Sequence, residues 1–159
     1  MKSNLIYETD FQKQIENAFL TYGASVAQER AIPDVRDMLK IGLRQGLYAQ
    51  FTNKLTHKDK MQKAQKSVAA AMNQSYVHGD VAMYDTFIRA ARPWSYRYPI
   101  EDVQGSFGNP SSPDSHAAPR YVEMRAGEIA DYFFAGLKKN AIGEQWYSNY
   151  DDTEMIPSV

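Results

Sequence analysis

The chain has 159 residues, of which 43% are apolar, and a formal net charge of −1. This length suits one domain with a real hydrophobic core, and the absence of cysteine excludes disulfide frameworks and thiolate metal sites. No apolar run approaches the roughly 20 residues that a membrane helix needs. We therefore expect a cytoplasmic protein with no membrane partner.

The small net charge conceals an uneven distribution along the chain. Residues 28–98 hold 12 Lys and Arg against 6 Asp and Glu, whereas the rest of the chain holds 6 against 13. Phosphate contacts need clustered positive charge, so double-stranded DNA is a candidate partner for this middle segment. A solvated, lysine-rich helix face would give the same pattern, and charge alone does not separate the two interpretations.

Apolar residues recur at helical spacing in the first half of the chain. The spacing predicts helices over residues 10–27, 39–51, 60–72 and 80–91. Asp80 is expected to cap the last of these helices, and Pro93 prevents its continuation. Gly42 and Gly46 weaken the second helix by roughly 1 kcal/mol each relative to alanine, which indicates close packing against a neighbour.

The third and fourth predicted helices are joined by a short turn that contains glycine, the form of a helix-turn-helix. Any helical hairpin would look similar. After Pro93, aromatic and turn-forming residues predict short strands over 97–103 and 121–123 with a long loop between them. Helical spacing returns over 124–139, and the acidic ending, 147–159, shows no core element. The expected fold class is mainly α with a small β wing.

The segment APRYVEMRAGEIA, Ala118 to Ala130, places Tyr121 directly after Arg120. A phenol with a pKa near 10 is a poor nucleophile at neutral pH, and a neighbouring cation favours its oxyanion. On a strand, adjacent side chains point to opposite faces, so a local kink or a partner chain must bring these two together. A packed aromatic is the simpler interpretation of one tyrosine among eleven.

Four segments of the chain stand in the order and spacing of one known family. They are ERAIPDVRDMLK, HGDVAMYDTFIRAARPWSYRYP, EDVQGSFG and PRYVEMR. From about Phe11 onward the chain resembles the breakage-reunion domain of the A subunit of bacterial type IIA topoisomerases, DNA gyrase and topoisomerase IV. The resemblance implies an N-terminal arm helix over residues 1–27 and a winged-helix (CAP-like) DNA-binding and DNA-breakage domain over residues 28–159.

The resemblance also implies roles for individual residues. Tyr121 falls on the nucleophile that forms a transient 5′-phosphotyrosyl DNA link for strand passage, and Arg120 on the cation that helps to hold the scissile phosphate. Arg30 and His78 fall on positions that support the reaction, where His78 can donate to a phosphate oxygen or to the leaving 3′ oxygen. Family position and surface charge together give the candidate DNA-binding residues, Lys40, Arg44, Lys63 and Lys66.

Partners and cofactors follow from the same resemblance. The family takes Mg²⁺ from acidic residues of a separate B-type subunit, which also uses the ATP, and this chain shows no carboxylate cluster of that kind. We therefore expect no metal ligands here, a homodimer that works at the nucleoid with a topoisomerase B-type subunit, and no cleavage by the isolated chain. His57 and His116 carry no matched motif and are expected at the surface.

The chain also departs from the family pattern at several positions. Tyr76-Val77 replaces His-Pro before His78, and Met38-Leu39-Lys40-Ile41 stands where the family reads Gly-Leu-Lys-Pro. Gln45 replaces the second of two arginines, and Pro119 replaces a methionine and restricts the backbone beside Arg120. These changes keep a second hypothesis open, a non-cleaving winged-helix DNA-binding or topoisomerase-interacting protein.

Overall fold

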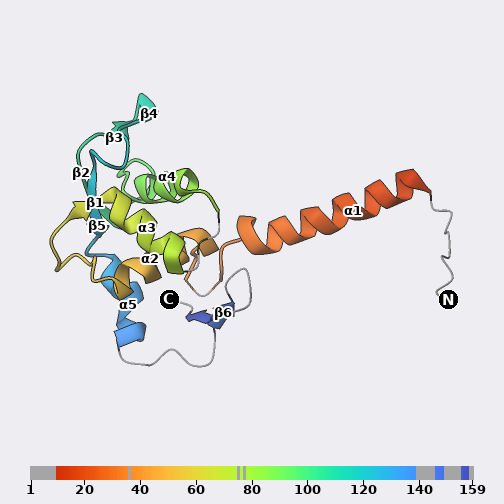
Figure 1. Ribbon diagram of the computed structural model, residues 1–159, viewed down its shortest axis with the longest axis horizontal. Helices are drawn as coiled ribbons and strands as arrows, with labels where there is room; N and C mark the ends of the chain where they lie inside the picture. The colour runs from red at the N-terminus through yellow and green to blue at the C-terminus, as the bar shows by residue number, and fades with distance from the viewer. Residues whose placement is uncertain are drawn as a thin grey trace, which may run out of the picture.

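The computed structural model describes residues 10–35, 37–74, 76, 78–138, 146–148 and 155–157, and their fold is mainly helical (Figure 1). The helical elements are α1 (Phe11–Val26), the π-helical turn η1 (Ala27–Ala31), α2 (Ile41–Thr52), α3 (Ala64–Gln74), α4 (Asp80–Ala90) and α5 (Ala130–Lys138). The prediction of a mainly α fold with a small β component is confirmed. No helix in these ranges is both long enough and apolar enough to span a bilayer.

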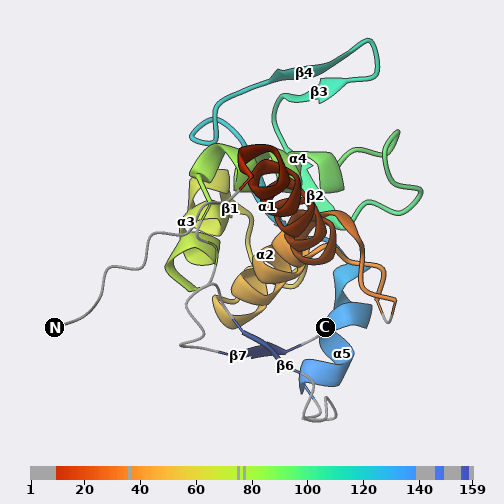
Figure 2. The ribbon, with the colours of Figure 1, turned by 90° about the vertical axis from the view of Figure 1, so that its right-hand side faces the viewer.

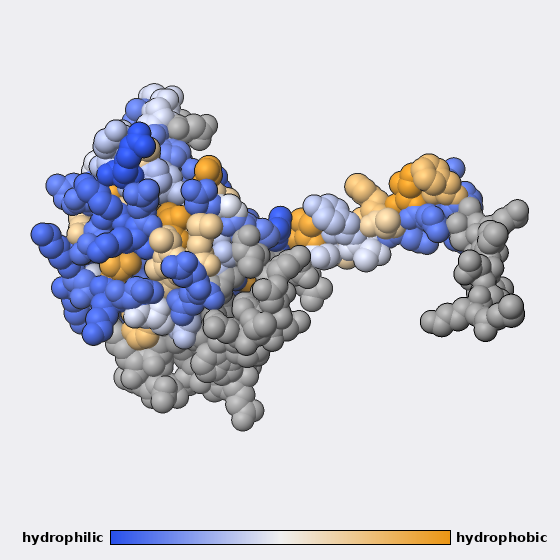
Figure 3. All heavy atoms as spheres, in the orientation of Figure 1, coloured by the Kyte–Doolittle hydropathy of each residue, from blue (hydrophilic) through white to orange (hydrophobic). Residues whose placement is uncertain are grey.

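Helix α1 projects from the rest of the molecule as an arm, seen lengthwise in Figure 1 and nearly end-on in Figure 2. Asp10 caps it by accepting from the Gln12 backbone N–H at 3.0 Å. None of its residues is buried. Phe11, Ile15 and Phe19 are all more than half exposed, and apolar surface is visible along the arm in Figure 3. The predicted helix is present, and its apolar stripe is uncovered in the described structure.

Helices α2, α3 and α4 pack together and form most of the core. One buried cluster centres on α3 and α4 and includes Val68, Met83 and Phe87. A Cβ built at Gly46 on α2 would lie 2.7 Å from the Phe87 ring, whereas one built at Gly42 would meet only an ordinary contact at 3.6 Å. The close packing inferred for the two glycines is therefore confirmed at Gly46 and not at Gly42.

A three-stranded antiparallel sheet closes one side of the helices, in the order β1 (Gln62–Lys63), β5 (Glu123–Ala126), β2 (Glu101–Gln104). Met124 pairs with Val103 in the central register, and Met124 and Ala126 are fully buried. The prediction of a helix from residue 124 was wrong, because this segment alternates between faces as a strand and α5 begins only at Ala130.

The expected long loop between the two strands contains a hairpin, β3 (Phe107–Asn109) and β4 (Ser112–His116), which extends beyond α4 (Figures 1 and 2). The Asn109 side chain shapes its turn by accepting from the N–H groups of Ser111 and Ser112 at 3.0 and 2.9 Å. The prediction of a loop with little structure was wrong here, because this side chain supplies the turn that closes the pair.

A last strand pair joins β6 (Trp146–Ser148) to β7 (Met155–Pro157). The rest of the acidic ending expected to lack a core element lies outside the described residues, as does most of the segment before α1.

Candidate active site

Helices α3 and α4 pack against each other and are separated by only five residues, an arrangement that a helix-turn-helix shares with other helical hairpins. Gly79 is the N-cap of α4, so the expectation that Asp80 caps this helix was one residue out. Asp80 is the first helical residue, where the positive end of the helix dipole stabilises its negatively charged carboxylate. Val81 is 67% exposed. The start of α4 therefore faces solvent, as a helix that enters a DNA groove must.

Arg120 and Tyr121 lie on a turn between β4 and β5. The strand predicted over residues 121–123 begins only at Glu123. The Tyr121 N–H donates to the Ala118 carbonyl at 2.9 Å. Arg120 Cζ lies 4.8 Å from the centre of the Tyr121 ring, which is a cation–π contact. The turn thus brings the two side chains together within one chain, and Tyr121 remains 64% exposed.

Arg30 and His78 meet although they lie 48 positions apart in the sequence. Arg30 Nη2 lies 3.0 Å from Nδ1 and 2.7 Å from Nε2 of His78, so the guanidinium lies against the imidazole. The ring of Tyr76 contacts that of His78 edge-on, with 5.4 Å between centroids. Tyr76 is buried, and burial raises its pKa. Tyr76 therefore packs against the His78 ring, but it does not replace the imidazole of the histidine that the family pattern has at this position.

Four predicted catalytic residues thus form two pairs. Among the residues that the structure describes, no hydrogen bond or ion pair joins the Arg30–His78 pair to the Arg120–Tyr121 pair. Each pair combines a permanent cation with a group that can accept or donate a proton, which is the combination that phosphate-ester chemistry needs.

The lysines proposed to bind DNA are exposed, but they are not equally free. Lys40 is the N-cap residue of α2 and makes no side-chain cap bond. Lys66 Nζ donates to the Gln62 side chain at 3.1 Å. Lys63 Nζ lies 2.9 Å from Glu123 Oε1, and the hydrogen bond from Lys63 lowers the pKa of that carboxyl. Part of the charge of Lys63 is therefore already neutralised.

Arg44 lies inside the fold, and its side chain is only 2% exposed. Its Nε donates to Asp37 Oδ2 at 3.1 Å, and its Nη2 forms an ion pair with the same carboxylate. Asp34 adds a second acid at 4.0 Å. The structure does not present Arg44 at a DNA-facing surface, because the turn before α2 supplies carboxylates that neutralise it. A contact between Arg44 and DNA stays a prediction, and the buried position of the Arg44 side chain argues against it.

His57 and His116, which were expected at the surface, are only partly exposed. Their side chains are 24% and 19% exposed, and each lies beside a carboxylate, His57 beside Asp131 at 3.2 Å and His116 beside Asp85 at 3.1 Å. No local pattern marks either pair, since both depend on the tertiary fold. The one available signal for His116 was its place five residues before Tyr121.

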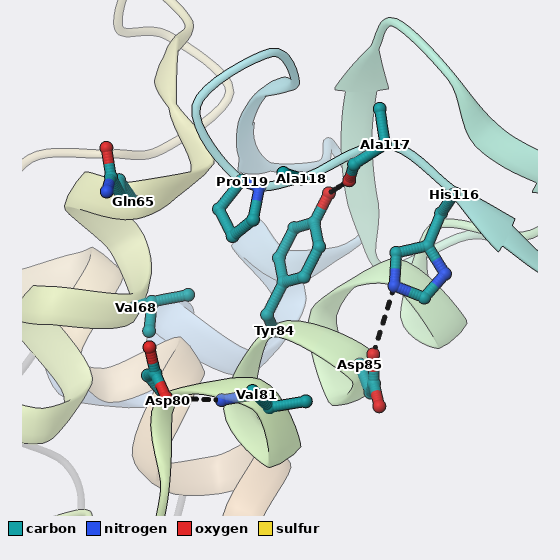
Figure 4. A pocket seen from close by; sticks show the side chains of 10 residues that line it. All are labelled: Gln65, Val68, Asp80, Val81, Tyr84, Asp85, His116, Ala117, Ala118 and Pro119. Atoms are coloured by element: carbon teal, nitrogen blue, oxygen red, sulfur yellow. Dashed lines mark hydrogen bonds and ion pairs between the residues drawn. The ribbon is translucent and has the colours of Figure 1, made fainter.

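A hollow of about 430 Å³ lies between the start of α4 and the segment that leads to Arg120 (Figure 4). Its lining residues are Gln65, Val68, Asp80, Val81, Tyr84, Asp85, His116, Ala117, Ala118 and Pro119. In the described ranges, no three His, Asp or Glu side chains converge in a way that could hold a metal ion. The described residues of this chain therefore do not fit a Mg²⁺ site of their own.

The fold and these side chains define a class of protein: a mainly helical domain with a small β-sheet, which presents an exposed tyrosine beside an arginine on a turn near the helix α4. Comparison with known proteins gives the family, because the model of the DNA gyrase/topoisomerase IV A-subunit family matches residues 30–159. The chain belongs to this family. The resemblance inferred from four sequence segments is confirmed.

Curated relatives agree with the family match. The chain is 37% identical to the DNA gyrase A subunit of Mycobacterium bovis (strain BCG / Pasteur 1173P2) and 39% identical to that of Buchnera aphidicola subsp. Baizongia pistaciae (strain Bp), over 97% of its own length in both cases. It is also 37% identical to the DNA gyrase A subunit of Pseudomonas aeruginosa PAO1. The chain spans 16–18% of the length of these relatives.

Proposed function

We propose that this chain is the DNA-cleavage domain of a type IIA topoisomerase A subunit, in which Tyr121 forms a transient 5′-phosphotyrosyl link to DNA. The observation that carries the proposal is the stack of Arg120 on an exposed Tyr121, 4.8 Å from guanidinium carbon to ring centre. The family match adds that curated relatives over this segment are named as A subunits of DNA gyrase.

In the proposed reaction, the phenol oxygen of Tyr121 attacks the phosphorus of a DNA phosphodiester. The bond from phosphorus to the 3′ oxygen breaks, the phenol loses its proton and the 3′ oxygen gains one. The Arg120 charge stabilises both the phenolate and the negative charge that develops on the phosphate. Attack by the 3′ hydroxyl on the phosphotyrosine reverses each step, so the strand is resealed without hydrolysis.

His78, in the turn before α4, and Arg30, on η1, are proposed to assist the reaction. An imidazole within reach of the leaving 3′ oxygen can give it a proton. Arg30, held 2.7 Å from His78 Nε2, supplies a second positive charge for the phosphate. His78 lies two residues before α4, whose first residues face solvent, and Arg30 of η1 contacts it there, which supports a position next to bound DNA.

We propose a homodimer that acts on double-stranded DNA in the cytoplasm, because cleavage of both strands requires two copies of Tyr121. A topoisomerase B-type subunit is the proposed source of Mg²⁺ and the user of ATP. The uncovered apolar side chains of α1, such as Phe11 and Phe19, support contact with a protein partner (Figure 3).

A non-cleaving DNA-binding or topoisomerase-interacting protein is the second candidate. The burial of Arg44 against Asp37 favours it, because one cation expected near DNA is neutralised within the fold. The restricted backbone of Pro119, next to Arg120, favours it as well. Under this alternative the chain binds DNA or a topoisomerase but forms no covalent link.

The two functions are separated by a covalent-adduct experiment. The chain is incubated with a B-type subunit that carries the metal and with supercoiled DNA, and linked protein is trapped with detergent. Tyr121→Phe should abolish the adduct and leave DNA affinity nearly unchanged, since one hydroxyl is lost. Tyr132→Phe changes another tyrosine, 78% exposed on α5, and is the matched control. An adduct that persists in Tyr121→Phe contradicts the assignment.

A further inference from the structure

Two consecutive residues of α4 hold two consecutive residues at the end of β4 (Figure 4). Asp85 Oδ1 lies 3.1 Å from His116 Nε2. The Tyr84 hydroxyl donates to the Ala117 carbonyl oxygen at 2.6 Å. Tyr84 is buried, and burial raises its pKa to about 12, so the hydroxyl keeps its proton and stays a donor at physiological pH. The end of the hairpin is thus attached to the helix at two adjacent points.

The backbone of β3 holds the same place from the other side. His116 pairs across the hairpin with Phe107, and the Ala117 N–H donates to the Ser106 carbonyl at 2.9 Å. The His116 ring also contacts the Tyr84 ring, with 5.3 Å between centroids. The position of Ala117 relative to α4 is therefore fixed by backbone bonds, side-chain bonds and ring packing together.

The chain from this attachment to the proposed nucleophile is short and restricted. Three residues separate Ala117 from Tyr121. Pro119 fixes its own φ and limits the conformations of Ala118, and the Tyr121 N–H returns to the Ala118 carbonyl at 2.9 Å. With so few free torsions, a displacement of Ala117 moves the phenol with it.

We propose that Asp85, His116 and Tyr84 are positioning residues that set the place of Tyr121 relative to α4. Their effect is that the phenol meets the phosphate of the DNA on which the helix rests. The cleavage part of this inference depends on the proposed function of the chain. Its structural part, the ordering of the turn that carries Tyr121, does not.

The structural part is tested by amide hydrogen exchange on the 159-residue chain. His116→Ala and Asp85→Ala should each speed exchange of the Tyr121 amide roughly tenfold, the order expected for loss of one good local contact. The double variant should exchange no faster than His116→Ala alone, because the Asp85 side chain acts through the His116 ring that this substitution already removes. Asp85→Asn keeps an oxygen that accepts from His116 and should restore most of the protection.

His57→Ala is the matched control, since it removes the other histidine–aspartate pair, with 3.2 Å between His57 Nδ1 and Asp131 Oδ2. It should leave the exchange of Tyr121 unchanged. Tyr84→Phe removes one hydroxyl and should speed exchange of the same amide with little effect on packing. Unchanged exchange in both alanine variants, or equal acceleration in His57→Ala, would overturn the inference.

The cleavage part is tested in the assembly with a B-type subunit. His116→Ala and Asp85→Ala should slow adduct formation at saturating DNA with DNA affinity unchanged, and Asp85→Asn should recover most of the rate. If the wild type forms the adduct and the alanine variants form it at the same rate, the inference is overturned and the proposed function is not. A wild-type protein that forms no adduct under the same conditions overturns the proposed function, and the cleavage role of the three residues with it.

Discussion

Met38 has a left-handed backbone, with φ of 58°, in the turn that leads to α2. A side chain at this φ is strained by roughly 1–2 kcal/mol, and the resembled family has glycine at this position. Met38→Gly should therefore raise the free energy of unfolding by up to about 1 kcal/mol, after the larger entropy of glycine in the unfolded chain is subtracted. The Met38 side chain is 70% exposed, so little packing is lost.

Urea unfolding of the wild type and Met38→Gly measures this difference. Val35→Gly, in the same turn at an 88% exposed position with no left-handed φ, is the control and should be destabilising. A Met38→Gly variant less stable than the wild type would show that the left-handed backbone carries no strain.

At the residue scale, the sequence predicts the identity of the site residues better than the contacts between their side chains. The adjacency of Arg120 and Tyr121 is evident from the sequence, but strand alternation would have placed them on opposite faces, and a turn stacks them instead. Helical spacing does not reveal that Arg44 points inward to Asp37. His116 has no motif at all, because its partner Asp85 lies on an element distant in sequence.

The contact between α2 and α4 depends on one glycine. Gly46→Ala would place its Cβ 2.7 Å from the Phe87 ring, and overpacking of this kind costs roughly 1–3 kcal/mol. Gly42→Ala meets only an ordinary contact with Tyr76, so the better helix propensity of alanine should stabilise the fold by about 0.5–1 kcal/mol. Thermal unfolding of both variants tests the pair, and two shifts of the same sign would contradict this packing.

Strand β2 begins with a buried carboxyl group, Glu101, which is 2% exposed. Burial raises its pKa well above the ordinary value of 4.5, and the bond from Gln50 Nε2 at 2.9 Å opposes that rise only in part. The folded state therefore binds this proton more tightly than the unfolded state. The stabilisation that the folded state gains from protonated Glu101 is complete below about pH 4.5. It is lost as the pH rises through the pKa of Glu101 in the folded state.

Glu101→Gln keeps the shape and the hydrogen bond to Gln50 but removes the titration. The variant should be more stable than the wild type at neutral pH, and the difference should shrink toward pH 4.5. Unfolding free energies measured across this pH range check the prediction. Parallel pH profiles for the two proteins would mean that the pKa of Glu101 is the same in the folded and unfolded states.

The positions of α2, α3 and α4 follow from the sequence because their apolar residues recur on the face that each helix buries. The exceptions have physical reasons. Residues 123–126 form a strand because they lie between β1 and β2, and this tertiary pairing overrides the helical spacing that continues into α5. The β3–β4 hairpin is rich in serine and turn residues, so its strands lack the apolar alternation by which a strand is normally recognised.

Over the whole molecule, the positive charge of residues 28–98 should determine how DNA affinity depends on salt. Lys40→Gln and Lys66→Gln should each flatten the slope of log affinity against log salt by about one if each lysine contacts a phosphate. Lys63→Gln should flatten it less, because Glu123 lies 2.9 Å from that ammonium group. Arg44 is left unchanged, since a substitution there would strand the buried Asp37.

Titrations of a DNA duplex by fluorescence anisotropy at several salt concentrations give these slopes. Lys13→Gln, on α1 and outside the basic segment, is the control and should leave the slope as it is. Equal slopes for the wild type and the Lys40 and Lys66 variants would mean that the positive charge of the middle segment is only a solvated surface.

We propose that Tyr121 becomes joined to a 5′ phosphate of DNA. The most direct measurement is to trap the adduct in the assembly with a B-type subunit, digest the protein and the DNA, and identify the modified residue by mass spectrometry. The expected result is a nucleotide on Tyr121, with DNA that is blocked to a 5′ exonuclease and open to a 3′ exonuclease. A nucleotide on any other residue, or DNA joined through its 3′ end, would contradict the claim.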